Sequence, residues 1–183
     1  MLNRLFALII LIISSPVFLV IAFAILIDNG YPIFFKQKRV GVNYLFFNIY
    51  KFRTMKKNTP NVATHLLTNP KQYLLKIGGI LRKLSLDELP NLINIIKGEM
   101  VFVGPRPALY NQDDLMILRV ATGVSKLKPG ITGWAQINGR DNISIEKKVQ
   151  LEQEYMYNRS ILFDIEIIIK TFTHVLFSKG VSH

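Results

Sequence analysis

The sequence predicts a mainly α-helical, membrane-associated protein with a small β-hairpin. Three observations indicate this class: an uncharged apolar run at residues 5–27, two aromatic-rich segments joined by a short Gly-containing turn, and apolar residues at helical spacing in the C-terminal third. A length of 183 residues suits a membrane segment followed by one domain. We therefore divide the chain into a membrane helix at 1–28 and a second unit at 29–183.

Composition excludes several classes of protein. Half of the residues are hydrophobic, so the chain can bury enough apolar surface to fold, and disorder is excluded. No cysteine is present, which excludes a disulfide framework, a thiol nucleophile and a thiolate zinc site. The three histidines, His65, His174 and His183, lie too far apart in the sequence to suggest a cluster of metal ligands.

The net charge of +11 is concentrated in one stretch of the chain. Residues 29–86 contain eleven Lys and Arg and no acid, which leaves twelve cations to balance the twelve acids of the whole chain. Such a stretch favours an anionic partner: nucleic acid, anionic lipid headgroups or a phosphorylated substrate. Asp87 and Glu88 are the first acids that follow it.

Residues 5–27 are predicted to enter a membrane. As a straight helix these 23 uncharged residues would rise about 34 Å, against roughly 30 Å of hydrocarbon core. A cleaved signal peptide is disfavoured because no small-residue cleavage site follows. Pro16 predicts a kink, so the segment is either a kinked span or a helix–break–helix hairpin with both ends on one side. Charge favours cytoplasmic ends, but the sequence leaves both topologies open.

The segments at 32–40 and 44–53 are rich in aromatic and β-branched residues and predict a β-hairpin with its turn at 41–43. Their cations alternate with aromatic residues, which would suit nucleic-acid binding in a soluble protein. Beside a membrane segment, contact with anionic lipid headgroups is favoured instead, so we expect no nucleic-acid partner. The polar stretch 56–73 is predicted to be a surface loop.

A short helix is predicted from Ser85 to the Lys97-Gly98 pair. Its acids, Asp87 and Glu88, allow two interpretations. Ser85 and Glu88 have the spacing of a capping box, which would make the acids structural. A functional role is favoured by their place at the end of the basic stretch, and by Pro90, which lies deeper than the first helical position, where capping gives no reason for it.

Two further segments are candidates for binding phosphate. Arg106 lies between two prolines that restrict the backbone, so its guanidinium would be presented with little freedom for bidentate binding. Residues 128–140 contain three glycines that allow tight turns and close approach of the backbone to a ligand, and they end at Arg140. Trp134, within that segment, is expected to pack in the core or at a membrane interface. No Walker or dinucleotide glycine pattern occurs, so a phosphate site would be built from arginines and a metal.

Two helices are predicted near the C-terminus. Residues 144–158 have the pattern of a conventional amphipathic helix. Residues 160–178 are too charged for a span and too apolar for an ordinary surface helix, with Glu166, Lys170 and His174 spaced by four along one face. An interfacial helix lying in the headgroup plane fits this pattern, and burial in a protein core is the alternative.

Five motifs, in this order, resemble the bacterial sugar transferases, the monotopic phosphoglycosyl transferases, in their minimal form. They are Lys-Phe-Arg-Thr-Met at 51–55, Leu-Ser-Leu-Asp-Glu-Leu-Pro-Asn at 84–91, Lys-Gly-Glu-Met at 97–100, Val-Gly-Pro-Arg-Pro at 103–107 and Lys-Pro-Gly-Ile-Thr-Gly at 128–133. The resemblance covers residues 4–180. One departure is Ala7, where many members carry an Asp three residues after a basic residue, here Arg4.

The resemblance implies a reaction and its residues. A sugar 1-phosphate would pass from a UDP-sugar to undecaprenyl phosphate, with release of UMP. Asp87 would be the nucleophile that forms a covalent phosphosugar-aspartyl intermediate, and Glu88 would hold Mg²⁺ on the diphosphate. The expected substrate-binding residues are basic: Lys51, Arg53, Arg82, Arg106 and Arg140.

The resemblance also implies a location. It favours a re-entrant membrane helix at 1–28, broken at Ser15 and Pro16, and a cytoplasmic, membrane-associated catalytic domain at 29–183. The fold would then be monotopic, with interfacial helices on the inner membrane of a bacterium, anionic lipids as partners and the active site on the cytoplasmic face. A homo-oligomer is compatible with the sequence. Similarity to capsular-polysaccharide members at 58–64 and 107–112 suggests a role in starting capsule synthesis and an N-acetylated, 6-deoxy UDP-hexosamine as donor.

Two alternatives remain open. The first is a non-enzymatic, membrane-anchored basic module that binds anionic lipid or nucleic acid, in which Asp87 and Glu88 could be replaced at the cost of a helix cap alone. The second is a different membrane transferase that acts on another activated donor.

Overall fold

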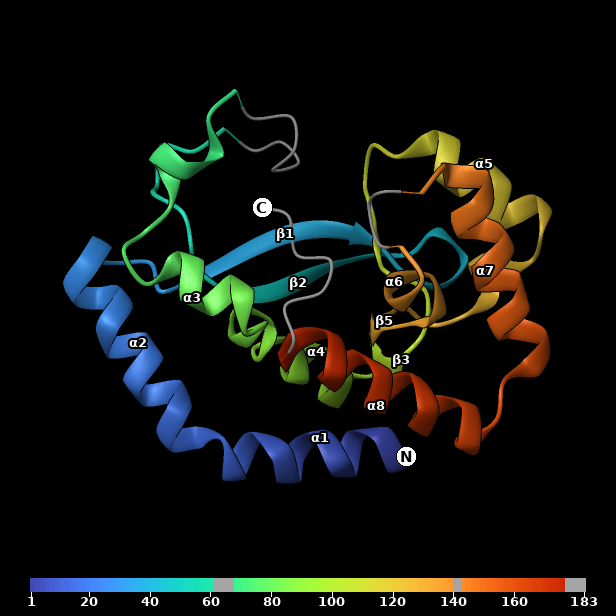
Figure 1. The fold of residues 1–183 in the computed structure, drawn as a ribbon, viewed down its shortest axis with the longest axis horizontal. Helices are drawn as coiled ribbons and strands as arrows, with labels where there is room; N and C mark the ends of the chain where they lie inside the picture. Colours follow the sequence, from blue (N-terminus) through green and yellow to red (C-terminus); the bar gives the residue numbers. More distant parts are fainter. Residues whose placement is uncertain (61–67, 140–142, 177–183) are drawn as a thin grey trace.

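A computed structural model describes residues 1–60, 68–139 and 143–176, and it begins with two helices joined at an angle. Helix α1 (Leu2–Ile13) and helix α2 (Ser15–Asn29) are bent by 63° at Ser14 (Figure 1). Pro16 lies in the first turn of α2, where its missing N–H costs nothing, and the Ser14 hydroxyl donates to the Leu11 carbonyl at 3.3 Å. The predicted break is confirmed. Within the described residues no single helix is long and apolar enough to cross a membrane, and only this bent pair passes that test together.

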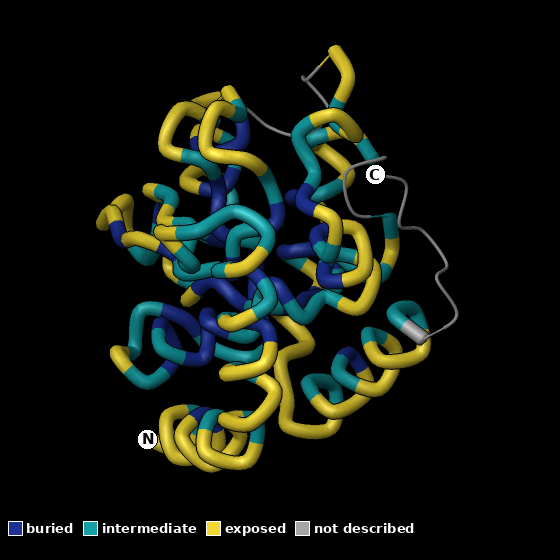
Figure 2. The backbone as a smooth tube through the Cα atoms, turned by 90° about the vertical axis from the view of Figure 1, so that its left-hand side faces the viewer, coloured by how far each residue is buried: buried dark blue, intermediate teal, exposed yellow. Residues whose placement is uncertain are grey.

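Both helices of the bent pair contact the rest of the protein through a few small or branched residues. Ala7, with no exposed surface, packs against Leu92 and Ile95 of helix α4 (Asn91–Lys97). Arg4 lies against Gly98, at the end of α4. In α2, Ile21 and Ile25 pack in a second cluster around Phe52. The remaining apolar residues of the pair are largely exposed, and Figure 2 colours most of this part of the backbone as exposed. Position 7 is therefore a buried contact, which a small apolar residue fits.

The predicted β-hairpin is confirmed. Strand β1 (Phe34–Val40) pairs antiparallel with β2 (Phe46–Phe52), and the 3₁₀ turn η1 (Val42–Tyr44) joins them. The structure adds a third strand, β4 (Ala108–Leu109), which pairs with the end of β1. Two residues of strand give no periodicity in a sequence, so this extension of the sheet was not predicted.

The predicted helix after Ser85 is wrong at its start. A short helix α3 (Gly78–Lys83) is followed by the 3₁₀ turn η4 (Leu86–Glu88) and then by α4 (Asn91–Lys97), with Pro90 at the N-cap of α4. Ser85 adopts a left-handed backbone conformation (φ 55°), whereas a capping residue needs an extended one. The end of the helix is as predicted, because Gly98 takes the left-handed conformation that closes α4.

A second, parallel sheet was not predicted. It consists of β3 (Val101–Val103) and β5 (Gly130–Thr132). Three glycines allow the two segments to approach closely: a Cβ at Gly130 would lie 2.2 Å from the amide nitrogen of Gly104, and one at Gly133 would lie 2.2 Å from the carbonyl oxygen of Gly104. Gly130 and Gly133, two of the three glycines expected to allow close approach to a ligand, thus bring backbone against backbone, and Gly130 also lines the cavity at Glu88.

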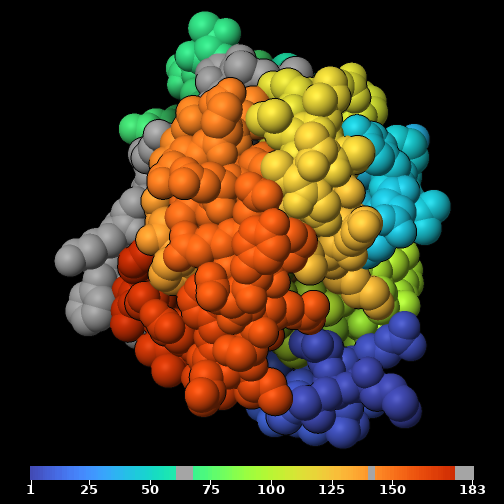
Figure 3. Space-filling view, turned by 90° about the vertical axis from the view of Figure 1, so that its right-hand side faces the viewer, coloured from blue at the N-terminus to red at the C-terminus, as the bar shows by residue number. Residues whose placement is uncertain are grey.

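From residue 113 onward the described chain is helical apart from β5 and the connecting segments. It contains α5 (Asp113–Ala121), the 3₁₀ turn η5 (Val124–Lys126), α6 (Trp134–Ile137), α7 (Ile145–Asn158) and α8 (Ile161–Leu176), while a further 3₁₀ turn, η3 (Pro70–Tyr73), lies in the predicted loop. Helix α7 begins as predicted, with the Ser144 hydroxyl accepting from the Lys147 amide. Figure 3 shows α5, α7 and α8 forming one face of the molecule.

Helix α8 is divided into a packed side and an exposed side. Ile167 is fully buried beside Val103, and Phe163 packs against Trp134 with ring centroids 5.0 Å apart. The other side carries exposed apolar residues: Ile161, Leu162, Ile165, Ile169 and Phe172. Trp134 is therefore a packing residue, as expected. Both α1 and α8 lie along the lower side of the molecule in Figures 1 and 2.

Candidate active site

Asp87 and Glu88 lie on η4, between strand β2 and helix α4. The side chain of Asn94 fixes α4 to the free edge of β2, since its Oδ1 accepts from the Tyr50 amide at 3.2 Å and its Nδ2 donates to the Asn48 carbonyl at 2.7 Å. Asn94 is itself fully buried. This side-chain bridge replaces a further strand, and it brings the acid pair against the end of β2, where Lys51 lies.

Glu88 gathers two of the predicted basic residues. Lys51 Nζ lies 2.5 Å from Glu88 Oε1, and Arg106 Nη1 lies 3.6 Å from the same oxygen. The three side chains come from β2, from η4 and from the loop after β3. Two cations around one carboxylate oxygen leave a net positive surrounding, which suits the phosphates of a ligand.

Asp87 has a different environment from its neighbour. Its exposed fraction is only 8%, and this burial raises the pKa of Asp87 from 3.8 to about 6. The charge of Glu88 also raises the pKa, while the cations Lys51 and Arg82 lower it. Asp87 is therefore a carboxylate that is ionised at neutral pH yet unusually basic, which is the state that favours a nucleophile or a general base.

Arg82 and Arg53 lie near this site with different partners. Arg82 Nε donates to Thr54 Oγ1 at 3.1 Å, and its Nη2 lies 3.4 Å from Met55 Sδ. Burial lowers the pKa of Arg82, and the charge of Asp87 opposes that shift. Arg53 follows β2, and its Nε is buried without a hydrogen-bond partner in the described part of the chain. Among the described residues, no hydrogen bond or ion pair joins Arg53 to Asp87 or Glu88.

The small cavity next to Glu88 is lined in part by residues that the sequence did not predict as site residues. Its lining includes Lys51, Glu88 and Arg106, together with Arg39 and Asn91, which were not predicted. Asn91 is almost fully buried, and its Oδ1 has no hydrogen-bond partner among the described residues. The spacing of four between Asp87 and Asn91 could have suggested a shared face, but Arg39 is distant in sequence and gave no signal.

Arg140, the remaining predicted substrate-binding residue, lies outside the described residues, as do His65, His183 and much of the loop at 58–64. The capping-box interpretation is wrong, because the Ser85 side chain makes no capping hydrogen bond within the described chain. The hydrogen bond at this turn runs instead from the Glu88 amide to the Ser85 carbonyl at 3.2 Å.

The arrangement of donors decides how a metal ion could be held. Across residues 1–60, 68–139 and 143–176 no three His, Asp or Glu side chains form a metal cluster. Glu88 is one hard oxygen donor that stays partly accessible to solvent. Mg²⁺ is commonly bound by one or two carboxylates plus substrate phosphates, so Glu88 fits a shared site that a diphosphate would complete.

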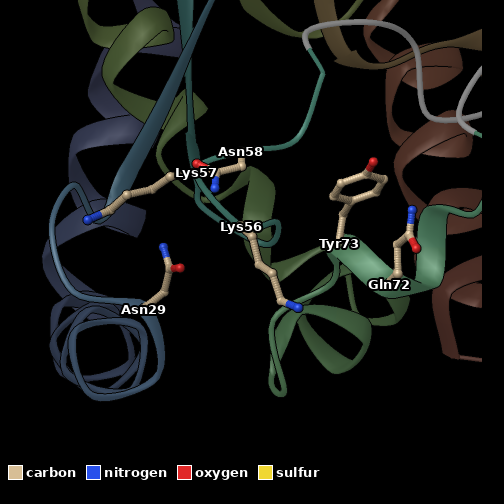
Figure 4. A pocket seen from close by; sticks show the side chains of 6 residues that line it. All are labelled: Asn29, Lys56, Lys57, Asn58, Gln72 and Tyr73. Atoms are coloured by element: carbon tan, nitrogen blue, oxygen red, sulfur yellow. The ribbon is translucent and has the colours of Figure 1, made fainter.

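A second, wider pocket lies away from the acid pair, between the end of α2 and the loop after β2. It is lined by Asn29, Lys56, Lys57, Asn58, Gln72 and Tyr73. Figure 4 shows that the ammonium groups of Lys56 and Lys57 point apart and that the Tyr73 hydroxyl points in a third direction. The polar groups of this pocket do not converge on one point, and its described lining residues include no carboxylate comparable to the acid pair.

Comparison with known proteins identifies the family. Residues 1–178 match the family model described as "Bacterial sugar transferase". The chain belongs to the bacterial sugar transferase family. As a member of this family it is an enzyme, so the resemblance drawn from the five motifs is confirmed and the non-enzymatic alternative is excluded.

Three curated proteins are similar to this chain over most of its length. An uncharacterized sugar transferase of Bacillus subtilis, EpsL, is 41% identical over 98% of this chain and 90% of its own length. The exopolysaccharide production protein ExoY of Sinorhizobium fredii is 38% identical over 96% of this chain and 84% of its own length. The UDP-glucose:undecaprenyl-phosphate glucose-1-phosphate transferase of Escherichia coli is 38% identical over 90% of this chain, which corresponds to 37% of that longer protein.

Proposed function

We propose that this enzyme transfers a sugar 1-phosphate from a UDP-sugar to undecaprenyl phosphate and releases UMP. The observation that carries the proposal is the convergence of Lys51 and Arg106 on Glu88, beside the buried carboxylate of Asp87. A diphosphate needs cations around its oxygens and a nucleophile that attacks phosphorus; Lys51 and Arg106 would supply the cations and Asp87 the nucleophile. The names of its relatives agree with the substrate classes.

Asp87 acts as the nucleophile in the proposed mechanism. A carboxylate oxygen of Asp87 attacks the sugar-bearing β-phosphorus, and the bond from this phosphorus to the oxygen shared with the α-phosphate breaks. UMP leaves with that electron pair, and the phosphosugar stays on Asp87 as an acyl phosphate. An oxygen of undecaprenyl phosphate then attacks the same phosphorus, and the Asp87 carboxylate leaves. The product is undecaprenyl diphosphate sugar.

The basic residues act on phosphate oxygens in both steps, first on the donor diphosphate and then on the phosphosugar bound to Asp87. Arg106 and Lys51 neutralise phosphate oxygens, and Arg82 balances the charge of Asp87 while it is ionised. Glu88 would hold Mg²⁺, which when bound neutralises charge on the diphosphate. Because Glu88 lies between Lys51 and Arg106, its oxygen is available to a metal once donor phosphates take over one of these cations.

The apolar exposed sides of α1, α2 and α8 support a position at a membrane surface. These sides contain most of the large apolar side chains that the described chain leaves exposed. Burying them in lipid would bring the site to the level of the phosphate of undecaprenyl phosphate, and the basic stretch 29–86 would face anionic headgroups on the cytoplasmic side. The reaction would start the synthesis of an exopolysaccharide or a capsule.

Release of UMP tests the reaction. The protein in nanodiscs is incubated with undecaprenyl phosphate, Mg²⁺ and a panel of UDP-sugars that includes glucose, galactose and N-acetylated 6-deoxyhexosamines. We expect UMP from at least one donor, loss of more than about 1,000-fold in Asp87→Asn because the nucleophile is removed, and a mass increase of one phosphosugar on the wild-type protein before the acceptor is added. Asp113→Asn, which removes an exposed acid on α5, is the control and should keep its activity.

Two results would count against this mechanism. The first is wild-type protein that releases no UMP from any donor of the panel. The second is an Asp87→Asn variant that keeps full activity, which would leave the site without its proposed nucleophile and would favour a different membrane transferase.

A further inference from the structure

Arg106 depends on its backbone for its position, because its side chain is partly exposed and only one ion pair, with Glu88 at 3.6 Å, is seen for it in the described chain. The segment 104–107 contains two prolines, which lack N–H groups and cannot form a regular ladder. Its carbonyl groups must therefore find donors elsewhere in the molecule.

Each residue of this segment has a backbone group that is hydrogen-bonded to another part of the described chain. The Gly104 amide donates to the Thr132 carbonyl, and the Pro105 carbonyl accepts from the Gly130 amide, both at 2.9 Å, so these two residues continue the pairing of β3 with β5. The next two carbonyls accept from arginine side chains. Arg119 Nη2 donates to the Arg106 carbonyl at 2.9 Å, and Arg39 Nη1 donates to the Pro107 carbonyl at 3.0 Å.

Of these two arginines, Arg39 lines the cavity at Glu88, whereas Arg119 is not among the residues that line it. Arg119 lies on α5 with 5% of its surface exposed, and Glu152 lies on α7 with 2% exposed. Arg119 Nε lies 2.8 Å from Glu152 Oε2, and its Nη2 lies 2.5 Å from Glu152 Oε1. Figure 3 shows α5 and α7 side by side on this face.

A buried ion pair is a weak source of stability, since desolvation of the two charges offsets their attraction. The geometry of the Arg119–Glu152 pair matters instead for the position of Arg106. The planar guanidinium of Arg119 binds Glu152 with two nitrogens and still donates to the Arg106 carbonyl, so it links α7 rigidly to the backbone of the residue that meets Glu88. A lysine in its place would keep the charge but could not span both acceptors in a fixed plane.

We propose that Arg119, held by Glu152, is a positioning residue that sets where the guanidinium of Arg106 lies relative to the Asp87–Glu88 pair. The inference rests on the proposed function, since it assigns Arg106 to the donor phosphates. Arg119 does not touch substrate. Its effect on the reaction passes through the Arg106 backbone alone.

A double-mutant cycle on UMP release tests this role. We expect Arg119→Lys to lower kcat/KM roughly 10- to 100-fold, because small displacements of a phosphate-binding group are costly to phosphoryl transfer. In an Arg106→Ala background the same substitution should change the residual kcat/KM less than about twofold, since no guanidinium is left to position. Glu152→Gln, which keeps the shape of the acceptor and removes its charge, provides a second variant for the same cycle should Arg119→Lys fold poorly.

The control weakens the same pair of helices without touching Arg106. Val149 lies on α7 and packs against Leu115 and Met116 of α5. Val149→Ala should lower the melting temperature, with kcat/KM per folded enzyme unchanged within about twofold. Equal losses from Arg119→Lys in the wild-type and Arg106→Ala backgrounds would overturn the positioning role and leave the proposed function standing. A wild-type protein that releases no UMP would overturn the proposed function itself, and this inference with it.

Discussion

At the scale of single residues, the two adjacent acids have separate environments. Asp87 is buried and its pKa is raised to about 6, whereas Glu88 is partly accessible and paired with Lys51. Two carboxylates whose surroundings differ in this way are suited to different tasks, one as the reacting group and the other as a holder of cations. The charge pattern of the sequence indicated both acids as candidates for the site, because they end the basic stretch. It could not show which of the two is buried, since that depends on β2 and α4 packing around η4.

The raised pKa of Asp87 predicts how stability depends on pH. The folded protein binds the Asp87 proton more tightly than the unfolded chain, so this group favours folding below pH 4 and loses that contribution as the pH rises from about 4 to about 6. Above pH 6 the ionised carboxylate costs about 3 kcal/mol at most. Asp87→Asn cannot ionise, so its melting temperature should exceed that of the wild type at pH 7.5 and match it near pH 4.

The measurement is thermal unfolding of both proteins in the same detergent at a series of pH values. Asp113→Asn is again the control, because this acid is exposed on the first turn of α5, and its difference from the wild type should be small at every pH. A melting temperature of Asp87→Asn below that of the wild type at pH 7.5 would contradict the argument. It would instead favour a structural role for this carboxylate.

At the scale of elements, what the sequence could predict depends on how local the signal is. The break predicted at Ser15 and Pro16 and found at Ser14, the hairpin of β1 and β2 and the helix α7 each follow from residues within one segment. The pairing of β3 with β5 joins segments about thirty positions apart through three residues each, too few for any periodicity. The bridge from Asn94 to β2 likewise depends on a fold already formed. Residues of the site could therefore be predicted, but the contacts that assemble them could not.

The glycines between β3 and β5 lead to a prediction for this element. Gly130→Ala would place a Cβ 2.2 Å from the Gly104 nitrogen and 2.5 Å from the Thr132 oxygen, and backbone atoms cannot yield as a flexible side chain can. We expect a loss of about 1–3 kcal/mol in the free energy of unfolding, together with lower activity, because the backbone before Arg106 must shift.

Gly79→Ala is the matched control for this substitution. Gly79 lies on α3, and a Cβ added there would have no neighbouring atom within 4 Å, so alanine should stabilise the helix by roughly 0.5–1 kcal/mol. Denaturant unfolding of the three proteins compares them directly. If Gly130→Ala and Gly79→Ala behaved alike, close backbone contact between β3 and β5 would not be the reason for a glycine at 130.

At the scale of the whole molecule, the contacts of the bent pair bear on its topology. Helix α1 is tied to α4 through the fully buried Ala7, and helix α2 is tied to β2 through Ile25, which packs in the cluster of Phe52. A pair that spanned the bilayer would carry one of these helices away from the domain and break its contacts. Both ends of the pair are therefore expected on the side of the membrane where the domain lies, as in a re-entrant hairpin.

Cysteine labelling tests this topology, and the chain offers a clean background because it contains no cysteine. Asn3→Cys, in the first turn of α1, and Lys38→Cys, on β1 after the pair, are made singly, with Lys147→Cys on α7 as the marker for the domain. In sealed vesicles a membrane-impermeant thiol reagent should label all three positions from the same side, because all three then belong to one face of the bilayer. Labelling of position 3 from the side opposite to positions 38 and 147 would show a spanning helix. The packing of Ala7 against α4 would then be lost in the membrane, and α1 would no longer be held against the domain.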